Sequence, residues 1–238
     1  MRSIAFIPAR IGSQRLKYKN LALINGKPLI AYAIDAAKKS KKFSKIVLNS
    51  DHEIFKKIAE RYKIDFYLRS KKLGKNNIKS DDVLYDFIKS YPNYEYVCWV
   101  NPIAPLQTSL DISEILNYFK KHKLDSLITV ENKKVHCLKE KIPINYIVKS
   151  KFEQTQNLIP IKTFVYSLMM WKVNTFINSY KKKKFGFFCG KFGTYALDPE
   201  KTVIIKTKSD LFLAEKILKL RNNDTNLKIK YDKVLKTV

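Results

Sequence analysis

The first 130 residues alternate between short apolar runs and longer segments in which apolar residues recur at helical spacing. We expect the apolar runs to be strands at residues 3–7, 45–49, 65–68, 96–100 and 126–130. We expect helices at residues 28–38, 53–62, 81–89 and 112–121. Strands that alternate with helices in this way are joined by right-handed crossovers and lie parallel to one another. The pattern therefore predicts an α/β fold with a doubly wound, mostly parallel, Rossmann-like sheet.

The alternation weakens between about residues 137 and 201, where runs such as TFVYSLMMW (residues 163–171) predict strands of a small mixed or antiparallel insertion. A strand at residues 203–205 and a helix at residues 209–220 then follow, with Ser209 as the expected N-cap and Asp210 in the first turn. A chain of 238 residues can bury one sizeable core. We therefore expect residues 1–238 to form a single domain that carries this insertion.

Ligands of parallel doubly wound sheets bind outside the carboxyl ends of the strands. Three loops follow predicted strands at those ends, namely residues 8–21, 49–52 and 101–108. We expect these loops to meet and to form the functional site.

The loop after the first strand reads IPARIGSQRLKYKNL (residues 7–21) and holds two of the chain's six arginines. Gly12 and Ser13 allow a tight turn that presents backbone N–H groups to phosphate oxygens. Four residues supply positive charge, namely Arg10, Arg15, Lys17 and Lys19. The loop matches neither the Walker P-loop nor the dinucleotide fingerprint. Its composition alone is compatible with a phosphate cradle and with a basic surface loop.

The 47 basic and 21 acidic residues leave a net charge of +26, which indicates what kinds of partner the protein could bind. Such a charge is typical of nucleic-acid or anionic-membrane partners. The lysines, however, are scattered over every predicted helix and turn, and no helix-turn-helix, zinc-finger or RNA-binding signature accompanies them. We therefore expect a small anionic substrate, and neither a nucleic acid nor a membrane as partner.

Histidines and cysteines predict neither a metal site nor a disulfide framework, because their spacing fits neither. They lie at His52, His122, His136, Cys98, Cys137 and Cys189. No apolar run has the length of a signal peptide core or a membrane span. We expect a reduced, cytoplasmic protein.

The run IPARIGSQRLKYKN, followed by GKPLI at residues 26–30, resembles the signature of the sugar-activating cytidylyltransferases, and specifically of the acylneuraminate (CMP-sialic acid) synthetases. CMP-Kdo synthetases share the I-P-A-R opening but usually continue with a proline-glycine-lysine-proline turn, so Lys19 and Asn20 favour the acylneuraminate branch. Weaker matches lie at residues 49–51, 68–69, 80–84, 101–106, 125–126 and 210–211.

This resemblance implies transfer of CMP from CTP to a sialic-acid-like (nonulosonate) sugar for surface polysaccharide biosynthesis. The anomeric hydroxyl of the small acidic sugar attacks the α-phosphorus of CTP and pyrophosphate leaves. Arg10 and Lys19 are implied to hold the triphosphate and to act in catalysis. The further nucleotide-binding residues that it implies are Gly12, Ser13, Gln14, Arg15, Asn20, Arg69, Ser80 and Asn101. A homodimer formed through the insertion at residues 137–201 is implied as well.

The chain departs from the family pattern at two places. In VNPIAPLQ (residues 100–107), Asn101 and Gln107 occupy positions where the family has glutamine and arginine. In VIIKTKSDL (residues 203–211), Ile204 and Lys206 stand where two aspartates are expected to bind Mg²⁺, which prefers oxygen ligands.

Two acidic residues remain near that stretch: Asp210 is expected to cap a helix, and Asp198 is a possible substitute ligand. Three alternatives follow. Mg²⁺ is held by the nucleotide phosphates and water, or the ammonium group of Lys206 replaces part of its charge, or the chain is a non-catalytic sugar-nucleotide-binding relative.

Overall fold

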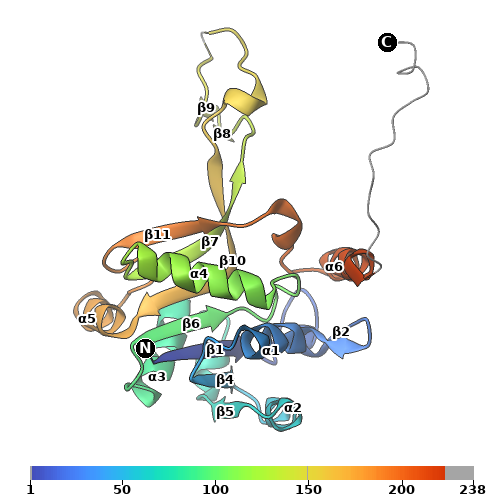
Figure 1. Cartoon of the computed structure of the whole chain (residues 1–238), viewed down its shortest axis with the longest axis vertical. Helices are drawn as coiled ribbons and strands as arrows, with labels where there is room; N and C mark the ends of the chain where they lie inside the picture. The colour runs from blue at the N-terminus through green and yellow to red at the C-terminus, as the bar shows by residue number, and fades with distance from the viewer. Residues whose placement is uncertain (1, 149, 223–238) are drawn as a thin grey trace.

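A computed structural model describes residues 2–148 and 150–222 of the chain. Its main sheet has seven strands: β1 (Ser3–Ala9), β4 (Lys45–Ser50), β5 (Asp65–Leu68), β6 (Tyr96–Val100), β7 (Ser126–Lys133), β10 (Ile161–Lys172) and β11 (Phe192–Ala196). Their order across the sheet is β11-β7-β10-β6-β1-β4-β5 (Figure 1). Only β10 runs antiparallel to its neighbours, β6 and β7. The predicted doubly wound, mostly parallel sheet is confirmed.

The described part of the chain has six α-helices: α1 (Leu29–Ser40), α2 (Ile54–Tyr62), α3 (Ser80–Ser90), α4 (Ser109–Lys121), α5 (Val173–Lys183) and α6 (Lys208–Asn222). The first five cover the two faces of the sheet, whereas α6 packs in a separate small cluster with Ile24. Successive β1 side chains point to opposite faces. Ala5 and Ile7 pack with α1, α2 and α4 in one core cluster, and Ile4 and Phe6 pack with α3 and α5 in another. Each face of the sheet therefore has its own apolar core.

Short elements complete the fold. The two-residue strands are β2 (Leu23–Ile24), β3 (Lys27–Pro28), β8 (Leu138–Lys139) and β9 (Ile142–Pro143). The 3-10 helices are η1 (Lys19–Leu21), η2 (Lys71–Gly74), η3 (Thr155–Asn157) and η4 (Pro199–Lys201). None of the helices in the part of the chain described is long and apolar enough to cross a membrane.

The strand predicted at residues 203–205 is wrong, because these residues form no ladder. The Ile205 N–H donates to the Ile103 carbonyl at 2.9 Å, and its side chain is buried in a small cluster with Ala214 of α6. The apolar run is thus explained by packing under a helix and not by strand pairing.

The predicted N-cap at Ser209 is also wrong, since α6 begins at Lys208. Thr207 precedes the helix, and its Oγ1 accepts a hydrogen bond from the Asp210 N–H at 3.3 Å. Asp210 lies in the first turn as expected, and its Oδ2 accepts the N–H groups of Lys206 (2.8 Å) and Thr207 (2.7 Å). Asp210 therefore caps the helix.

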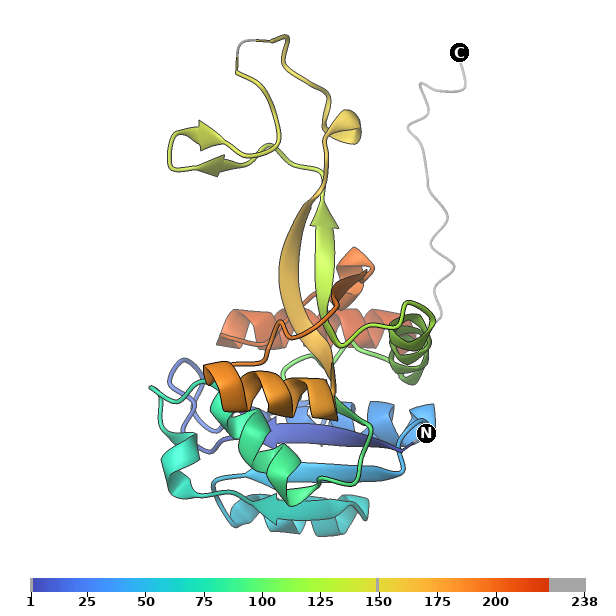
Figure 2. The same cartoon turned by 90° about the vertical axis from the view of Figure 1, so that its left-hand side faces the viewer.

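Only part of the segment predicted as an insertion protrudes from the main body of the structure. β7 and β10 run out of the sheet as a pair, and residues 134–148 and 150–160 between them form a protruding arm that carries the β8–β9 hairpin (Figure 2). β10, α5 and β11 belong instead to the main body of the fold. The dimerisation role of residues 137–201 stays a prediction.

Candidate functional site

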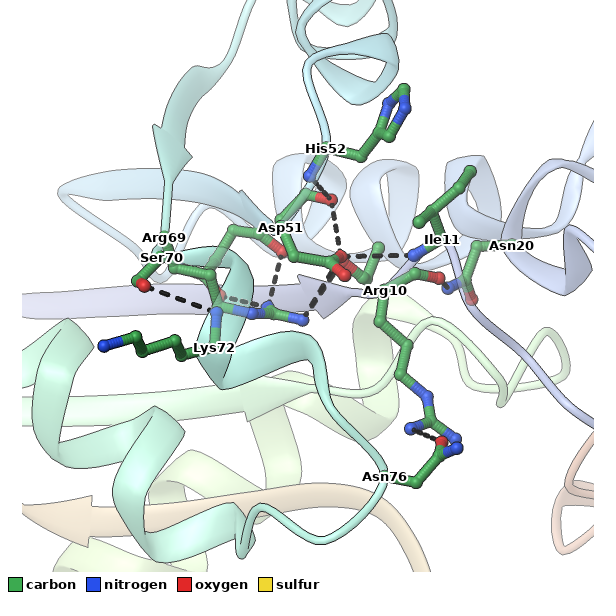
Figure 3. A network of polar contacts seen from close by, with 12 residues as sticks. Arg10, Ile11, Asn20, Asp51, His52, Arg69, Ser70, Lys72 and Asn76 are labelled. Carbon is green, nitrogen blue, oxygen red and sulfur yellow. Dashed lines mark hydrogen bonds and ion pairs between the residues drawn. The ribbon is translucent and has the colours of Figure 1, made fainter.

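The carboxyl ends of β1 and β6 open into a cavity of about 400 Å³, which we call the cationic cavity. It is lined by Pro8, Arg10, Ser13, Gln14, Arg15, Lys19, Asn20, Asn101, Pro102 and Ile103. The loops after β1 and β6 therefore meet as predicted. The third loop, after β4, contacts the loop after β1, because Asp51 Oδ1 accepts a hydrogen bond from the Ile11 N–H at 3.1 Å (Figure 3).

Among the described residues, the lining of the cationic cavity has three positive side chains and no carboxylate. Lys19 begins η1, and its Nζ donates to the Ile205 carbonyl at 3.1 Å. Burial, followed by the nearby charges of Arg15 and Arg10, lowers the pKa of Lys19 to about 8. A phosphate group in this cavity would relieve the repulsion among these three cations, so the site is suited to a polyanion.

Asn20 is buried behind the loop that carries these cations. Its Nδ2 donates to the Arg10 carbonyl at 3.4 Å, which ties the two ends of the loop together. Its Oδ1 has no hydrogen-bond partner among the described residues although it is buried. Asn20 thus fixes the loop and keeps one acceptor free at the edge of the cavity.

Arg10 lies between the cationic cavity and a second cavity of about 230 Å³. The second cavity is lined by Pro8, Arg10, Arg69, Leu73, Lys75, Ile78, Ser80, Val83 and Trp99. Arg10 Nη1 donates to Asn76 Oδ1 at 2.7 Å, so its guanidinium reaches the loop between η2 and α3 (Figure 3). The two cavities therefore form neighbouring compartments that share Arg10.

Arg69 lines the second cavity, but its Nη groups bond into the protein. Nη1 donates to the carbonyl oxygen of Asn49, at 3.2 Å, and to its Oδ1, while Nη2 donates to the Ala9 carbonyl at 3.4 Å. Nη2 also lies 3.7 Å from Asp51 Oδ1. Burial lowers the pKa of Arg69, although the Asp51 charge opposes this shift. Arg69 thus braces the carboxyl ends of β1, β4 and β5 (Figure 3).

Asn101 lines the cationic cavity, yet its amide also bonds to the backbone. Nδ2 donates to the Tyr166 carbonyl at 2.9 Å, and Oδ1 accepts the Ile103 N–H at 3.4 Å. Tyr166 has a φ of 59°, and the register of β10 shifts between Phe164 and Met169. Asn101 therefore ties the irregular part of β10 to the loop that follows β6 and lines the cationic cavity.

Gly12 lines neither of these two cavities. It lies on a separate groove with Tyr18 and His52, and a Cβ added to it would meet nothing within 4 Å. The structure thus gives no steric reason within the protein for a glycine here.

Apart from Gly12, the predicted site residues are therefore distributed over both compartments. Arg10, Ser13, Gln14, Arg15, Lys19, Asn20 and Asn101 line the cationic cavity, and Arg69 and Ser80 join Arg10 at the second. Their contacts with a nucleotide stay predictions. Sequence reasoning assigned no role to Asp51, although it directly follows a strand, and it missed Asn76, for which no local signal exists.

The residues near the expected metal position do not fit a divalent cation. Ile204 packs against the core and Lys206 is exposed. Burial raises the pKa of Asp210, but hydrogen bonds from the N–H groups of Lys206 and Thr207 outweigh it and lower the pKa, so this carboxylate is engaged in capping. Asp198 pairs with Lys201 at 2.9 Å. Within residues 2–148 and 150–222, no group of three His, Cys, Asp or Glu side chains could hold a metal ion.

Comparison with known proteins finds similarity over most of the chain. A family model described as cytidylyltransferase matches residues 4–157. The N-acylneuraminate cytidylyltransferase of Streptococcus agalactiae serotype V is 26% identical over 218 residues, which cover 88% of this chain and 52% of that protein. The pseudaminic acid cytidylyltransferase of Campylobacter jejuni is 35% identical over 111 residues, or 44% of this chain and 48% of that protein.

The matched segments of this chain thus cover about half the length of each of these curated relatives. Among solved structures, the CMP:2-keto-3-deoxy-manno-octonic acid synthetase complexed with CTP superimposes with a TM-score of 0.69. The match covers 93% of this chain and 100% of that one. At 11% sequence identity, this likeness shows a shared fold.

Proposed function

Because this chain belongs to the cytidylyltransferase family, as the match over residues 4–157 shows, we propose that it transfers CMP from CTP to a sialic-acid-like (nonulosonate) sugar. The observation that carries the proposal is the cationic cavity, where Arg10, Arg15 and Lys19 converge at the carboxyl ends of parallel strands. The names of the two relatives, which specify N-acylneuraminate and pseudaminic acid, support this class of acceptor.

The two compartments suggest how CTP is held. The triphosphate lies in the cationic cavity, and the base enters the second cavity, where Ile78, Val83 and Trp99 offer apolar walls and Ser80 offers a hydroxyl. Arg10 lines both compartments, so it is placed beside the α-phosphate that joins nucleoside and pyrophosphate.

The transfer forms a bond between the anomeric oxygen of the sugar and the α-phosphorus. The bond from the α-phosphorus to the bridging oxygen breaks, pyrophosphate leaves, and the proton of the attacking hydroxyl passes to water. Arg10 and Lys19 stabilise the charge that develops on the phosphate oxygens, since fixed cations in a formed site need little reorganisation. No step is assigned to a metal held by the protein.

A non-catalytic nucleotide-binding relative is the second candidate function. The observation that favours it is the replacement of the expected carboxylates by Ile204 and Lys206, while Asp210 is engaged in capping. This candidate predicts CTP binding without turnover. Restoration of turnover in Ile204→Asp with Lys206→Asp would support it.

The experiment combines calorimetric titration with CTP and a pyrophosphate-release assay on the same sample. N-acetylneuraminic acid, pseudaminic acid and Kdo are offered as acceptors, each with Mg²⁺ and with Mn²⁺. Release with either of the first two acceptors supports the transferase, and binding without release supports the second candidate. Absence of CTP binding contradicts both.

Arg10→Ala tests the phosphate assignment in that assay. Loss of one charge-assisted contact costs about 1.5 to 3 kcal/mol, which weakens CTP binding roughly 10-fold to 150-fold. Lys57→Ala on α2 is the matched control, since Lys57 is exposed and outside both cavities. Equal CTP affinities for the two variants would contradict the role of Arg10.

A homodimer formed through the arm is part of the proposal. The arm exposes large apolar side chains along its length, with Phe152 82% and Ile159 75% exposed. Apolar surface of this extent on a protruding segment is typical of a protein interface. Light scattering should give twice the chain mass, and Phe152→Asp with Ile159→Asp should shift the mass toward one chain.

A further inference from the structure

Beyond the proposed function, the segment before α6 brings positive charge close to the cationic cavity. Lys19 Nζ donates to the carbonyl of Ile205 at 3.1 Å, and the next residue along the chain is Lys206. Burial and the charges of Arg15, Arg10 and Lys206 lower the pKa of Lys19, while the charge of Asp210, which acts more strongly than that of Lys206, raises it. The four cations Arg10, Arg15, Lys19 and Lys206 therefore lie in one region together with the carboxylate of Asp210.

The backbone that carries Lys206 is held in place by α6. Asp210 Oδ2 accepts the N–H groups of Lys206 and Thr207, and the Ile205 N–H is bonded to the Ile103 carbonyl of the cavity loop. The segment is thus attached both to the helix and to the rim of the cavity. The ammonium group of Lys206 extends from an anchored position and not from a free loop.

Among the described residues, no carboxylate lines the cationic cavity, and Asp210, whose charge acts on Lys19, has its Oδ2 occupied in the helix cap. Asp198 is engaged by Lys201. Protein sites for Mg²⁺ usually offer one or two carboxylates together with the substrate phosphates. This donor set offers ammonium and guanidinium groups instead.

We propose that the cationic cavity binds the nucleoside triphosphate in its metal-free form, and that Lys206, beside Lys19, supplies positive charge in place of a divalent cation held by the protein. This inference rests on the proposed function, because it assumes that CTP enters the cavity. It specifies further that the ligand is the free tetra-anion of CTP. A Mg²⁺ ion on the phosphates reduces the charge that the four cations attract and is itself repelled by them.

The test is calorimetric titration of the full chain with CTP, once in EDTA and once in excess MgCl₂. We expect the Kd in EDTA to be equal to or lower than the Kd in MgCl₂. A Kd in EDTA more than about threefold higher than in MgCl₂ overturns the inference while the proposed function stands. No binding in either buffer overturns the proposed function itself, so the two failures are distinguishable.

Lys206→Asp sharpens the test because it reverses the charge at the position in question. It should weaken metal-free CTP binding by about tenfold or more, and added Mg²⁺ should restore much of the loss. Lys206→Met should weaken binding without rescue by Mg²⁺. Unchanged metal-free affinity in both variants overturns the role of Lys206.

Lys57→Asp is the control for the change in net charge, since Lys57 is an exposed residue of α2 outside the cavity. We expect its metal-free CTP affinity to match that of the unmodified chain. Urea unfolding of each variant checks that a lost affinity does not reflect a lost fold. An equal loss of affinity in Lys57→Asp and Lys206→Asp overturns the inference, because it would show a long-range charge effect and no local role.

Discussion

Replacing Arg69 by methionine should destabilise the fold, because the buried guanidinium links the carboxyl ends of three strands. The change removes the bonds to Asn49 and Ala9 and leaves the buried Asp51 carboxylate without its ion-pair partner, with only hydrogen bonds such as that from the Ile11 N–H. Removing one partner of a buried ion pair costs about 3 to 5 kcal/mol. For a chain of this size each kcal/mol lowers Tm by about 2 to 4 °C, so we expect a decrease of roughly 6 to 20 °C.

Urea unfolding followed by circular dichroism measures the free energy of unfolding directly. Arg61→Met on α2 is the matched control, because Arg61 is exposed and such surface changes usually stay within about 0.5 kcal/mol. A loss of less than about 1 kcal/mol for Arg69→Met would refute the bracing role. If the same variant nevertheless lost CTP affinity, Arg69 would be a nucleotide contact, as the family resemblance implies, and not a structural residue.

Three further predictions concern the loop, the pH dependence and a helix cap. CTP affinity should fall as pH rises through about 8, approaching tenfold per pH unit, because the triphosphate binds the protonated form of Lys19; equal affinities at pH 7 and pH 9.5 would contradict this. Gly12→Ala should leave Tm unchanged, since its Cβ meets open space, and weaker CTP binding in calorimetry would then report close approach of a phosphate. Thr108→Ala should cost about 1 kcal/mol in urea unfolding through loss of the α4 capping box, with no loss if the cap is unimportant.

The sheet and the position of the site could be predicted from local patterns. The β1, β4 and β6 segments read as short apolar runs between helical segments, which is sufficient to place their carboxyl ends together. The charged loop after β1 was visible because arginine is rare elsewhere in the chain. Each of these features is determined by residues that lie close together in the sequence.

The rest depends on contacts between residues that are far apart in sequence. The hydrogen bond from Arg10 to Asn76 joins positions 66 residues apart, and that from Arg69 to Ala9 joins positions 60 apart. No periodicity reports such pairs, so local patterns predict neither the bracing contacts of Arg69 nor the contact between Arg10 and Asn76. The residues at 203–205 were read as a strand because burial under α6 produces the same apolar run as burial in a sheet.

The arm is a continuation of two core strands and not an appendage on a linker. β10 has 12 residues, which at about 3.3 Å each span roughly 40 Å of continuous strand from the sheet into the arm. The register shift at Tyr166 lies within this strand, where Asn101 ties it to the cavity loop. In a homodimer joined through its arms, the length of β10 would fix the distance from each nucleotide site to the dimer interface. The distance between the two nucleotide sites would then have a single value, and paired spin labels near the two cavities should report one narrow distance distribution.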